Sequence, residues 1–391
     1  MARDRAGRSV VEPQAVVDAR MMNRAIKLAR RGEGRVEPNP MVGCVVTRGG
    51  RIVSEGYHRR FAGPHAEIEA LSACANPPRG STVYVSLEPC CHQGKTPPCT
   101  DALINAGVSR VVAAVHDPSP TAGDGVRRMR RAGIAVEVGL LAGESAEVLA
   151  PFLTRVCLRR PFVIAKWAQS LDGKLATHTG QSRWISCESS RRRVHHLRAR
   201  VDAILVGSGT VAADNPMLTA RDVPLRRRAL RVVLDGRLRI SEKCHLVTTA
   251  REFPTIVFTS ARTAGTSKAE LLALKGVELV TCRENRCRQL VLGECLKELA
   301  HRGVTNLLVE GGPTVLTSFF ELGLVDEAFV FTAPVLIGGR EAPTAFGGHG
   351  ARRIDEGITA QSINTSRCGV DTLHRIRLRD PRELVRLTLS V

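Results

Sequence analysis

Hydrophobic residues recur along the first half of the chain with two spacings, one typical of helices and one typical of strands. Residues 15–31 repeat apolar positions on one side of a helix, whereas 43–47 and 51–56 read as two strands. Gly49 and Gly50 lie between these strands and predict a hairpin turn. The further predicted helices are 65–75, 99–106, 126–131 and 140–158, and the further predicted strands are 82–87 and 108–115.

This order of strands and helices favours a three-layer α/β domain with a mostly parallel core. Arg159-Arg160-Pro161 then breaks the last helix and marks a domain boundary. A second α/β series follows, with strands at 162–167, 203–206, 231–235, 255–259, 277–280, 306–309 and 328–335. We therefore expect a disordered tail over residues 1–16, a first domain over 17–158 and a second domain over 161–391.

Length and composition agree with two folded domains. The chain has 391 residues, of which 43% are hydrophobic, so each half can bury a core. No apolar run approaches the roughly 20 residues that a membrane span requires, and the N-terminus carries no hydrophobic secretory segment. The 12 cysteines show no disulfide framework. We expect a cytoplasmic protein with reduced thiols and without membrane contact.

The chain is strongly basic, with a formal net charge of +19. Such a charge can attract nucleic acid, attract small polyanions, or simply keep the surface solvated. Aromatic residues make up only 4% of the chain, which argues against platforms for stacked bases. Phosphorylated small molecules and surface solvation are therefore favoured, and no specific nucleic-acid partner is expected.

One pattern in the first domain predicts a catalytic metal site. His65 and Glu67 form an H-x-E motif, and Pro89-Cys90 and Cys99 follow at the end of the next predicted strand and the start of the next helix. One imidazole and two thiolates can hold Zn²⁺ and leave the fourth position for water. Glu67 can then carry protons between that water and a leaving amine, as in the zinc deaminases.

Alternatives to this ligand set come from the neighbouring residues. Cys91 is a rival ligand, but Cys90 directly follows the proline and is preferred, and Glu69 is assigned to the helix surface. A purely structural zinc site usually has four protein ligands, which the pattern lacks. Eight residues separate the two cysteines, and they include His92 and Lys95. These two side chains suit a phosphate or a polar heterocycle, and ordinary loop polarity explains them equally well.

Two glycine-rich turns in the second domain are candidates for nucleotide binding. Residues 207–212 fit the G-x-G-x-x-A fingerprint, but Pro216 arrives too early for the long helix of a dinucleotide-binding unit. Residues 309–314 combine a strand end, a glycine turn and a helix start, where free N–H groups could hold a pyrophosphate. A plain strand-to-helix turn remains an equal alternative for the second segment.

Several longer runs resemble one known family. In the first half these are Glu88-Pro-Cys-Cys-His-Gln-Gly-Lys-Thr-Pro-Pro-Cys99 and Pro38-Asn-Pro-Met-Val-Gly43. Together with runs in the second half, they resemble the bifunctional deaminase–reductases of riboflavin biosynthesis over about residues 17–380. The resemblance implies a cytidine-deaminase-like three-layer domain followed by a dihydrofolate-reductase-like α/β domain. The runs of the second half are 166–174, 182–186, 206–210, 214–216 and 310–313.

The resemblance also implies a reaction and its cofactors. A zinc-dependent domain would deaminate 2,5-diamino-6-ribosylamino-4(3H)-pyrimidinone 5′-phosphate, and an NADPH-dependent domain would reduce the ribosyl group to a ribityl chain. The expected partner is this small phosphorylated pyrimidine, and a homo-oligomer is left open. The alternative function is a nucleic-acid or nucleoside deaminase with a basic accessory domain.

Site residues carried over from the family fall into three groups. The zinc ligands are His65, Cys90 and Cys99, with Glu67 as the catalytic proton carrier. The substrate-binding residues are Asn39, His58, His92, Lys95, Lys166, Ser182, Arg198, Leu218, Arg221 and Glu310. The cofactor-binding residues are Ala168, Trp184, Thr210, Asp214, Gly312, Pro313, Thr314, Val315 and Leu316.

Overall fold

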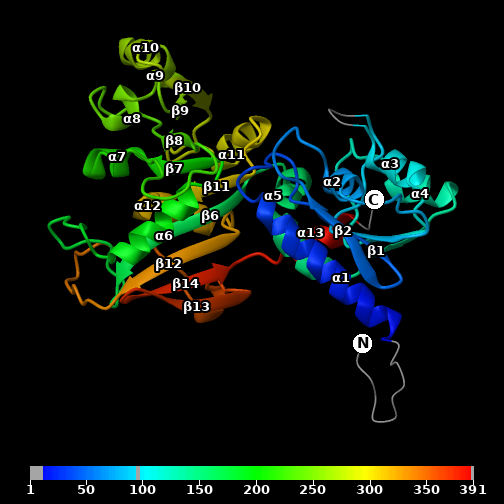
Figure 1. The fold of residues 1–391 in the computed structure, drawn as a ribbon. Helices are drawn as coiled ribbons and strands as arrows, with labels where there is room; N and C mark the ends of the chain where they lie inside the picture. The colour runs from blue at the N-terminus through cyan, green and yellow to red at the C-terminus, as the bar shows by residue number, and fades with distance from the viewer. Residues whose placement is uncertain (1–11, 94–96, 389–391) are drawn as a thin grey trace. The chain divides into compact units, whose positions relative to one another are not determined.

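The computed structural model describes residues 12–93 and 97–388, which fold into two compact units (Figure 1). Unit 1 runs to Leu158 and takes up the chain again at Pro381, and unit 2 comprises Arg159–Asp380. Residues 1–11 of the expected tail lie outside the described part of the chain, and the first helix already begins at Gln14.

Unit 1 is built on a five-stranded sheet with the order β2-β1-β3-β4-β5. The hairpin of β1 and β2 is antiparallel, β3 is antiparallel to β1, and β3, β4 and β5 run parallel. Gly49 and Gly50 both adopt positive φ in the hairpin turn, a conformation that glycine takes without steric cost. The strands are β1 Gly43–Arg48, β2 Arg51–Tyr57, β3 Thr82–Val85, β4 Arg110–Ala113 and β5 Ala135–Val138.

Two glycines show how helices cover both faces of this sheet. Gly56 pairs with Cys44, so the two residues share one face, while Gly43 faces the other side. A Cβ on Gly43 would lie 2.0 Å from the carbonyl oxygen of Ala25, and a Cβ on Gly56 would lie 2.4 Å from the amide of Ala70. Helices therefore approach the sheet closely on opposite faces, which gives three layers. These helices and their neighbours are α1 Gln14–Ala29, η1 Arg30–Gly32, α2 Ala66–Ser72, α3 Cys99–Asn105, α4 Gly125–Arg131 and α5 Ala142–Leu158.

The last helix of the chain belongs to unit 1. Helix α13, Pro381–Thr388, contacts α5, and its Leu384 and Val385 are buried in the hydrophobic core of unit 1. This placement differs from the expected second domain of 161–391, because the chain returns to its first unit after residue 380. Both ends of the folded chain thus contribute to one core.

Unit 2 is built on a nine-stranded sheet with the order β10-β9-β8-β7-β11-β6-β12-β14-β13. Seven strands are parallel, and the hairpin of β13 and β14 adds an antiparallel edge. The strands are β6 Phe162–Ser170, β7 Ala203–Gly207, β8 Leu230–Leu234, β9 Thr255–Ser260, β10 Glu278–Cys282, β11 Asn306–Val309, β12 Glu327–Ala333, β13 Ser362–Cys368 and β14 Asp371–Arg377.

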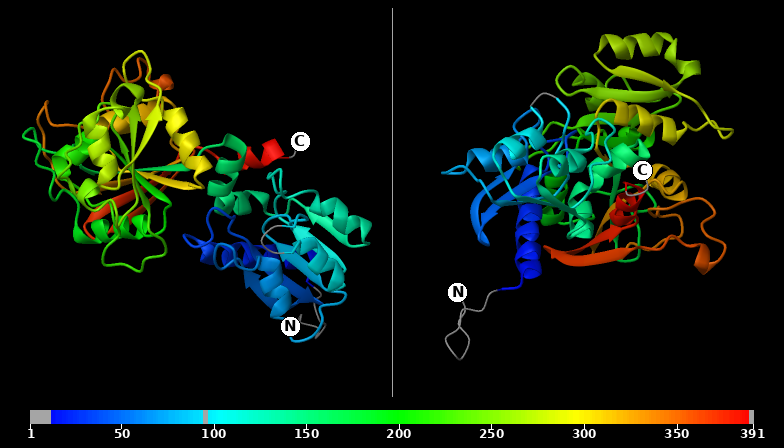
Figure 2. Two further views of the ribbon diagram at one scale, coloured as in Figure 1. Left: turned by 90° about the horizontal axis from the view of Figure 1, so that it is seen from above. Right: turned by 90° about the vertical axis from the view of Figure 1, so that its right-hand side faces the viewer.

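Both faces of the central strands are covered, because every residue of β7 is buried (Figure 2). Leucine and phenylalanine side chains of α11 and α12 pack on one face. Helix α7 is short, as the early proline predicts, and it ends at Asn215 in the left-handed conformation. The helices are α6 Glu188–Arg198, α7 Ser208–Asp214, α8 His245–Thr248, α9 Ala261–Ala264, α10 Ser267–Leu274, α11 Leu292–His301, α12 Pro313–Glu321 and the short turn η2 Ile354–Glu356.

The observed fold class is the expected one, a three-layer α/β unit followed by a second α/β unit. Among the described residues, no helix combines the length and the apolar character needed to cross a bilayer.

Candidate active sites

Three metal-ligating side chains converge in unit 1. The Nδ1 atom of His65 lies 3.3 Å from the Sγ atom of Cys99 and 3.6 Å from that of Cys90. The donor atoms of all three residues lie within 4.8 Å of one another. His65 directly precedes α2, Cys99 is the first residue of α3, and Cys90 follows the end of β3. Two helix starts and a strand end therefore position the donors.

The chemistry of this donor set fits Zn²⁺. One imidazole and two sulfur ligands are typical of a catalytic zinc site that keeps an open position. A hydrogen bond from Cys99 and a further one from His65 lower the pKa of the Cys90 thiol, which favours the thiolate that a metal needs. The rival Cys91 lies elsewhere: its amide donates to the carbonyl of Ala122, and its sulfur lies against Gly123.

Glu67 lies beside these ligands on the first turn of α2. Its residue surface is only 3% exposed, and burial raises the pKa of its carboxyl group to about 7. Its carboxylate also interacts with the thiol of Cys99. A carboxyl group with a pKa near neutrality can both accept and return a proton under physiological conditions. This is the property that the proton carrier of a deaminase requires.

Asn39 and His58 form a second pair close to His65. The Nδ1 atom of His58 lies 2.8 Å from the carbonyl oxygen of Pro64, and because a carbonyl only accepts, Nδ1 carries the proton. Burial lowers the pKa of His58, which favours the neutral ring, and the Nε2 atom of that ring accepts from the Asn39 amide at 3.2 Å. His92 is exposed, and Lys95 lies outside the described residues.

Sequence reasoning missed the role of Glu88, which organises the loops behind the cysteines. Its carboxylate accepts hydrogen bonds from the amide of Val126 at 2.9 Å and from the ring of His116 at 2.8 Å. It also accepts from the amide of Asp117 at 3.4 Å. The available signal was its position directly before Pro89-Cys90 in the sequence.

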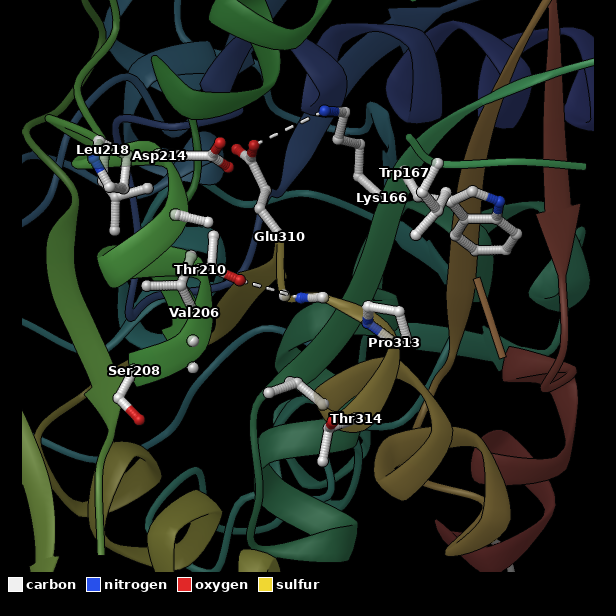
Figure 3. Close-up of a pocket in the computed structure, with 18 of the residues that line it drawn as sticks. Lys166, Trp167, Val206, Ser208, Thr210, Asp214, Leu218, Glu310, Pro313 and Thr314 are labelled. Atoms are coloured by element: carbon white, nitrogen blue, oxygen red, sulfur yellow. Dashed lines mark hydrogen bonds and ion pairs between the residues drawn. The ribbon is translucent and has the colours of Figure 1, made fainter. Parts of the chain in front are cut away.

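The second site is a cleft of about 2090 Å³ in unit 2, at the carboxyl ends of β6, β7, β11 and β8 (Figure 3). Ligands of open parallel sheets bind at this edge. The cleft lining includes every substrate-binding residue expected in this half and all but one of the cofactor-binding residues. The exception is Leu316, whose side chain is fully buried in the core beneath α12.

A charged cluster lies at one end of this cleft. Arg198 holds Glu310 with two hydrogen bonds of 2.7 and 2.8 Å, and the Nζ atom of Lys166 lies 3.7 Å from the same carboxylate. Burial would raise the pKa of Glu310, but the charges of Arg198 and Lys166 outweigh it and lower the pKa to about 2. Burial in turn lowers the pKa of Lys166. Figure 3 shows the side chain of Asp214 at this same end.

Two glycine turns meet in the middle of the cleft. The amide of Gly312, directly before α12, donates to the hydroxyl of Thr210 in α7 at 3.1 Å. A Cβ on Gly207 or Gly311 would come within 2.8 Å of Val315, so only glycine permits this close approach. Helix N-termini carry partial positive charge and free N–H groups, which suits the pyrophosphate of a dinucleotide such as NADPH.

Trp184 is a third feature of the cleft. Its side chain is 68% exposed, although large aromatic groups are usually buried, and the guanidinium of Arg191 lies 4.7 Å from the ring centroid. The cleft lining contains further basic residues to which sequence reasoning assigned no role. They are Arg183, Arg191, Arg192, His195, Arg237, Arg239, His245 and Arg288.

Comparison with protein families assigns both units. Residues 16–115 match the cytidine and deoxycytidylate deaminase zinc-binding region, and residues 161–373 match the RibD C-terminal domain. The riboflavin biosynthesis protein RibD of Actinobacillus pleuropneumoniae is 40% identical over 361 residues, which are 92% of this chain and 95% of that protein. RibD of Aquifex aeolicus is 41% identical over 356 residues, 91% of this chain and 97% of that protein.

A solved structure agrees with these relatives. The diaminohydroxyphosphoribosylaminopyrimidine deaminase/5-amino-6-(5-phosphoribosylamino)uracil reductase of Thermotoga maritima superposes with a TM-score of 0.82 at 36% identity, covering 94% of this chain and all of that one. The pairing of a deaminase region with this reductase domain does not favour a nucleic-acid deaminase. The chain belongs to the RibD family of riboflavin biosynthesis proteins, which are bifunctional deaminases and reductases.

Proposed function

We propose that unit 1 hydrolytically deaminates 2,5-diamino-6-ribosylamino-4(3H)-pyrimidinone 5′-phosphate and that unit 2 reduces the ribosyl group of the product with NADPH. The observation that carries the proposal is the convergence of His65, Cys90 and Cys99 within 4.8 Å, with the buried carboxyl group of Glu67 beside them. The second support is a separate cleft with a cationic end and two glycine turns.

In the deamination, His65, Cys90 and Cys99 would hold zinc, which when bound makes a water molecule nucleophilic near neutral pH. Glu67 accepts a proton from the attacking water and delivers it to the departing amino nitrogen. The carbon–nitrogen bond is thereby replaced by a carbonyl group, and ammonia leaves. The raised pKa of Glu67 suits both halves of this transfer.

The hydrogen-bonded Asn39–His58 pair supports recognition of the pyrimidinone. His58 occupies one donor of the Asn39 amide, and among the described residues no other hydrogen bond engages this side chain, so its second donor and its carbonyl oxygen can bind the ring edge. His92 and Lys95 would bind the phosphate or the polar edge of the same substrate. This assignment for His92 and Lys95 rests on the family resemblance, because His92 is exposed and Lys95 lies outside the described residues.

In the reduction, NADPH when bound would supply a hydride for C1′ of the sugar. Lys166 would donate a proton to the sugar oxygen, and Glu310 holds Lys166 and Arg198 in place through its ion pairs. Arg198 and Arg221 provide positive charge for the substrate phosphate, with Ser182 and Leu218 completing the substrate side. The cofactor side would comprise Ala168, Trp184, Thr210, Asp214 and the run from Gly312 to Leu316, of which all but Leu316 line the cleft.

The direct test supplies the purified protein with the diamino substrate in the presence and in the absence of NADPH. We expect ammonia release in both cases and NADPH oxidation only after ammonia release. Supplying the deaminated intermediate should restore NADPH oxidation to a variant that cannot deaminate. Absence of ammonia release from the zinc-loaded protein would overturn the first half of the proposal, and absence of NADPH oxidation with the deaminated intermediate would overturn the second.

We also propose a cytoplasmic location. All 12 cysteines are free thiols in the structure, including the partly exposed zinc ligand Cys90 and the exposed Cys287. Free thiols persist in reducing compartments. Fractionation of cells that express the full chain tests this, and activity confined to a secreted fraction would contradict it.

A further inference from the structure

Residues 218–222 carry two of the side chains assigned to the substrate, and their backbone is strained at both ends. Leu218 has a φ of +52° and Asp222 has a φ of +59°, the left-handed region that residues other than glycine rarely adopt. Leu218, Arg221 and Asp222 all line the unit 2 cleft (Figure 3). Such a conformation persists where surrounding contacts fix it, so other parts of unit 2 must hold this segment.

Two side chains of α6, about one helical turn apart, supply these contacts. The amide of Arg221 donates a hydrogen bond to the Nδ1 atom of His195 at 3.2 Å. Three residues further along the helix, the Nη1 atom of Arg198 donates to the carbonyl oxygen of Thr219 at 3.3 Å. Residues three apart project from the same face of a helix, so α6 holds the segment at two successive points.

The hydrogen bond from Arg221 defines the state of the His195 ring. A backbone amide only donates, so Nδ1 carries no proton and the ring is neutral. The surroundings agree, because burial and the charges of Arg198 and Arg221 lower the pKa of His195. The charge of Glu310 and a backbone hydrogen bond with Thr219 oppose this shift. His195 therefore serves as a hydrogen-bond acceptor rather than as another cation of the cleft.

Arg198 and His195 divide the work on this segment unequally. Arg198 directs its Nε and Nη2 atoms to Glu310, and its Nη1 atom to Thr219. The reaction proposed above gives His195 no part, although the residue lines the cleft. Its hydrogen bond leads to the backbone of Arg221, whose guanidinium is proposed for the substrate phosphate.

We propose that His195 is a positioning residue for substrate binding, because its neutral ring fixes the backbone at Arg221 and thereby the place where the Arg221 guanidinium meets the substrate phosphate. This inference rests on the proposed reductase function. A guanidinium binds a phosphate through paired hydrogen bonds of defined geometry, so a shift of its backbone weakens the contact. His195 should therefore affect the KM of the phosphorylated pyrimidine and leave kcat unchanged.

Two substitutions at His195 separate the acceptor from the bulk of the side chain. His195→Leu removes the acceptor and keeps an apolar group of similar size, whereas His195→Asn keeps an oxygen that can accept from the Arg221 amide. At pH 8 we expect the KM for the deaminated substrate to rise about five- to tenfold in the leucine variant, the contribution of one hydrogen bond. The kcat and the KM for NADPH should stay unchanged, and the asparagine variant should keep the wild-type KM.

His196→Asn provides a matched control. His196 is exposed on the same helix and does not line the cleft, so this variant should keep every wild-type constant. Melting temperatures should match among the variants, which separates a lost contact from a lost fold. A leucine variant with an unchanged substrate KM would overturn the inference, and so would an asparagine variant as impaired as the leucine variant.

A double variant shows whether His195 acts through Arg221. Arg221→Gln alone should raise the substrate KM, because the guanidinium is lost. Adding His195→Leu to that variant should change the KM by less than about twofold, since the group that His195 positions is no longer present. If the two effects instead multiply in full, His195 acts on another part of the site and the inference fails.

Amide hydrogen exchange tests the contact without substrate or turnover. A peptide that contains Arg221 should exchange roughly fivefold faster in His195→Leu than in the wild-type full chain, and at the wild-type rate in His195→Asn. Equal exchange in the leucine variant and the wild-type protein would overturn the contact. Failure of the wild-type protein to reduce the deaminated substrate would count against the proposed function instead, and the exchange result would still decide whether His195 holds the segment.

Discussion

Arg198 and Glu310 form a two-point ion pair inside the unit 2 cleft, with hydrogen bonds of 2.7 and 2.8 Å. The pair joins a residue at the end of α6 to the residue that directly follows β11, and Lys166 of β6 approaches the same carboxylate. Removing one partner of such a buried pair leaves the other charge without compensation. The carboxylate of Glu310 therefore both positions the side chain of Arg198 and balances the positive charges of Arg198 and Lys166.

Glu310→Gln should disable reduction without affecting deamination. The amide keeps the size of the side chain but loses the charge that orients Arg198 and Lys166, so we expect NADPH oxidation to fall by about 100-fold. Ammonia release from the diamino substrate should stay at the wild-type rate, because the deaminase residues all lie in unit 1. Parallel assays of ammonia and NADPH check this. A variant that reduces the deaminated substrate at the wild-type rate would remove Glu310 from the site.

The two adjacent cysteines should respond differently to the same substitution. Cys90→Ser removes a sulfur that lies 3.6 Å from His65 Nδ1, so bound zinc and ammonia release should both be lost. Cys91→Ser should retain both, because the Cys91 side chain lies against Gly123. Elemental analysis of the two purified variants measures the zinc content. Zinc loss from the Cys91 variant together with retention in the Cys90 variant would reverse the ligand assignment.

The stability of unit 1 should depend on pH through Asp18. Its carboxylate accepts hydrogen bonds from Arg110 at 2.7 and 2.9 Å and from Tyr84 at 2.5 Å. The hydrogen bonds from Arg110 are the main reason that the pKa of Asp18 falls to about 2, although burial opposes the shift. A carboxyl group whose pKa is lowered on folding stabilises the fold above its unfolded pKa, near 3.9, and loses this effect as the pH falls toward 2.

Asp18→Asn should therefore lower the free energy of unfolding by about 2 kcal/mol at pH 7. The difference from the wild-type protein should shrink as the pH falls below 4. Glu137→Gln is the matched control, because Glu137 pairs with the same Arg110 at the surface, where an ion pair contributes little. Denaturant titrations at pH 7 and pH 3 provide the measurement. If Asp18→Asn destabilised the protein equally at both pH values, the stabilisation could not come from the lowered pKa of Asp18.

Helix α13 should stabilise unit 1 rather than unit 2. Leu384 of α13 is 3% exposed and packs in the core of unit 1, so Leu384→Ala should cost about 3 kcal/mol in that unit. Ammonia release should be lost at a lower temperature than in the wild-type protein. The thermal inactivation of NADPH-dependent reduction should be unchanged. Loss of reductase activity ahead of deaminase activity would show that the helix stabilises the other unit.

Sequence periodicity was sufficient to predict most of the regular elements. The helix at Gln14–Ala29, the hairpin around Gly49 and the strand series of unit 2 all lie where apolar spacing places them. The edge strand Ser362–Cys368 was missed because six of its seven residues are exposed, so it shows no alternation of apolar and polar positions. The short strand Ala135–Val138 was missed as well, because four residues offer too little pattern.

Long-range relationships were harder to predict than local ones. Nothing in the local pattern of 381–388 indicates that Leu384 returns to the first core, because burial there depends on packing against α5. Leu316 was expected at the cofactor, and the structure shows that its side chain packs in the core, so any contact from it would come from its backbone.

The central claim is that a three-ligand zinc site works with Glu67 as the proton carrier. The most direct test measures zinc content and ammonia release for Glu67→Gln, with the deaminated intermediate and NADPH as a control for unit 2. We predict one zinc ion per chain, ammonia release reduced by at least about 100-fold, and unchanged NADPH oxidation. Ammonia release at the wild-type rate from the zinc-loaded Glu67→Gln protein would contradict the account.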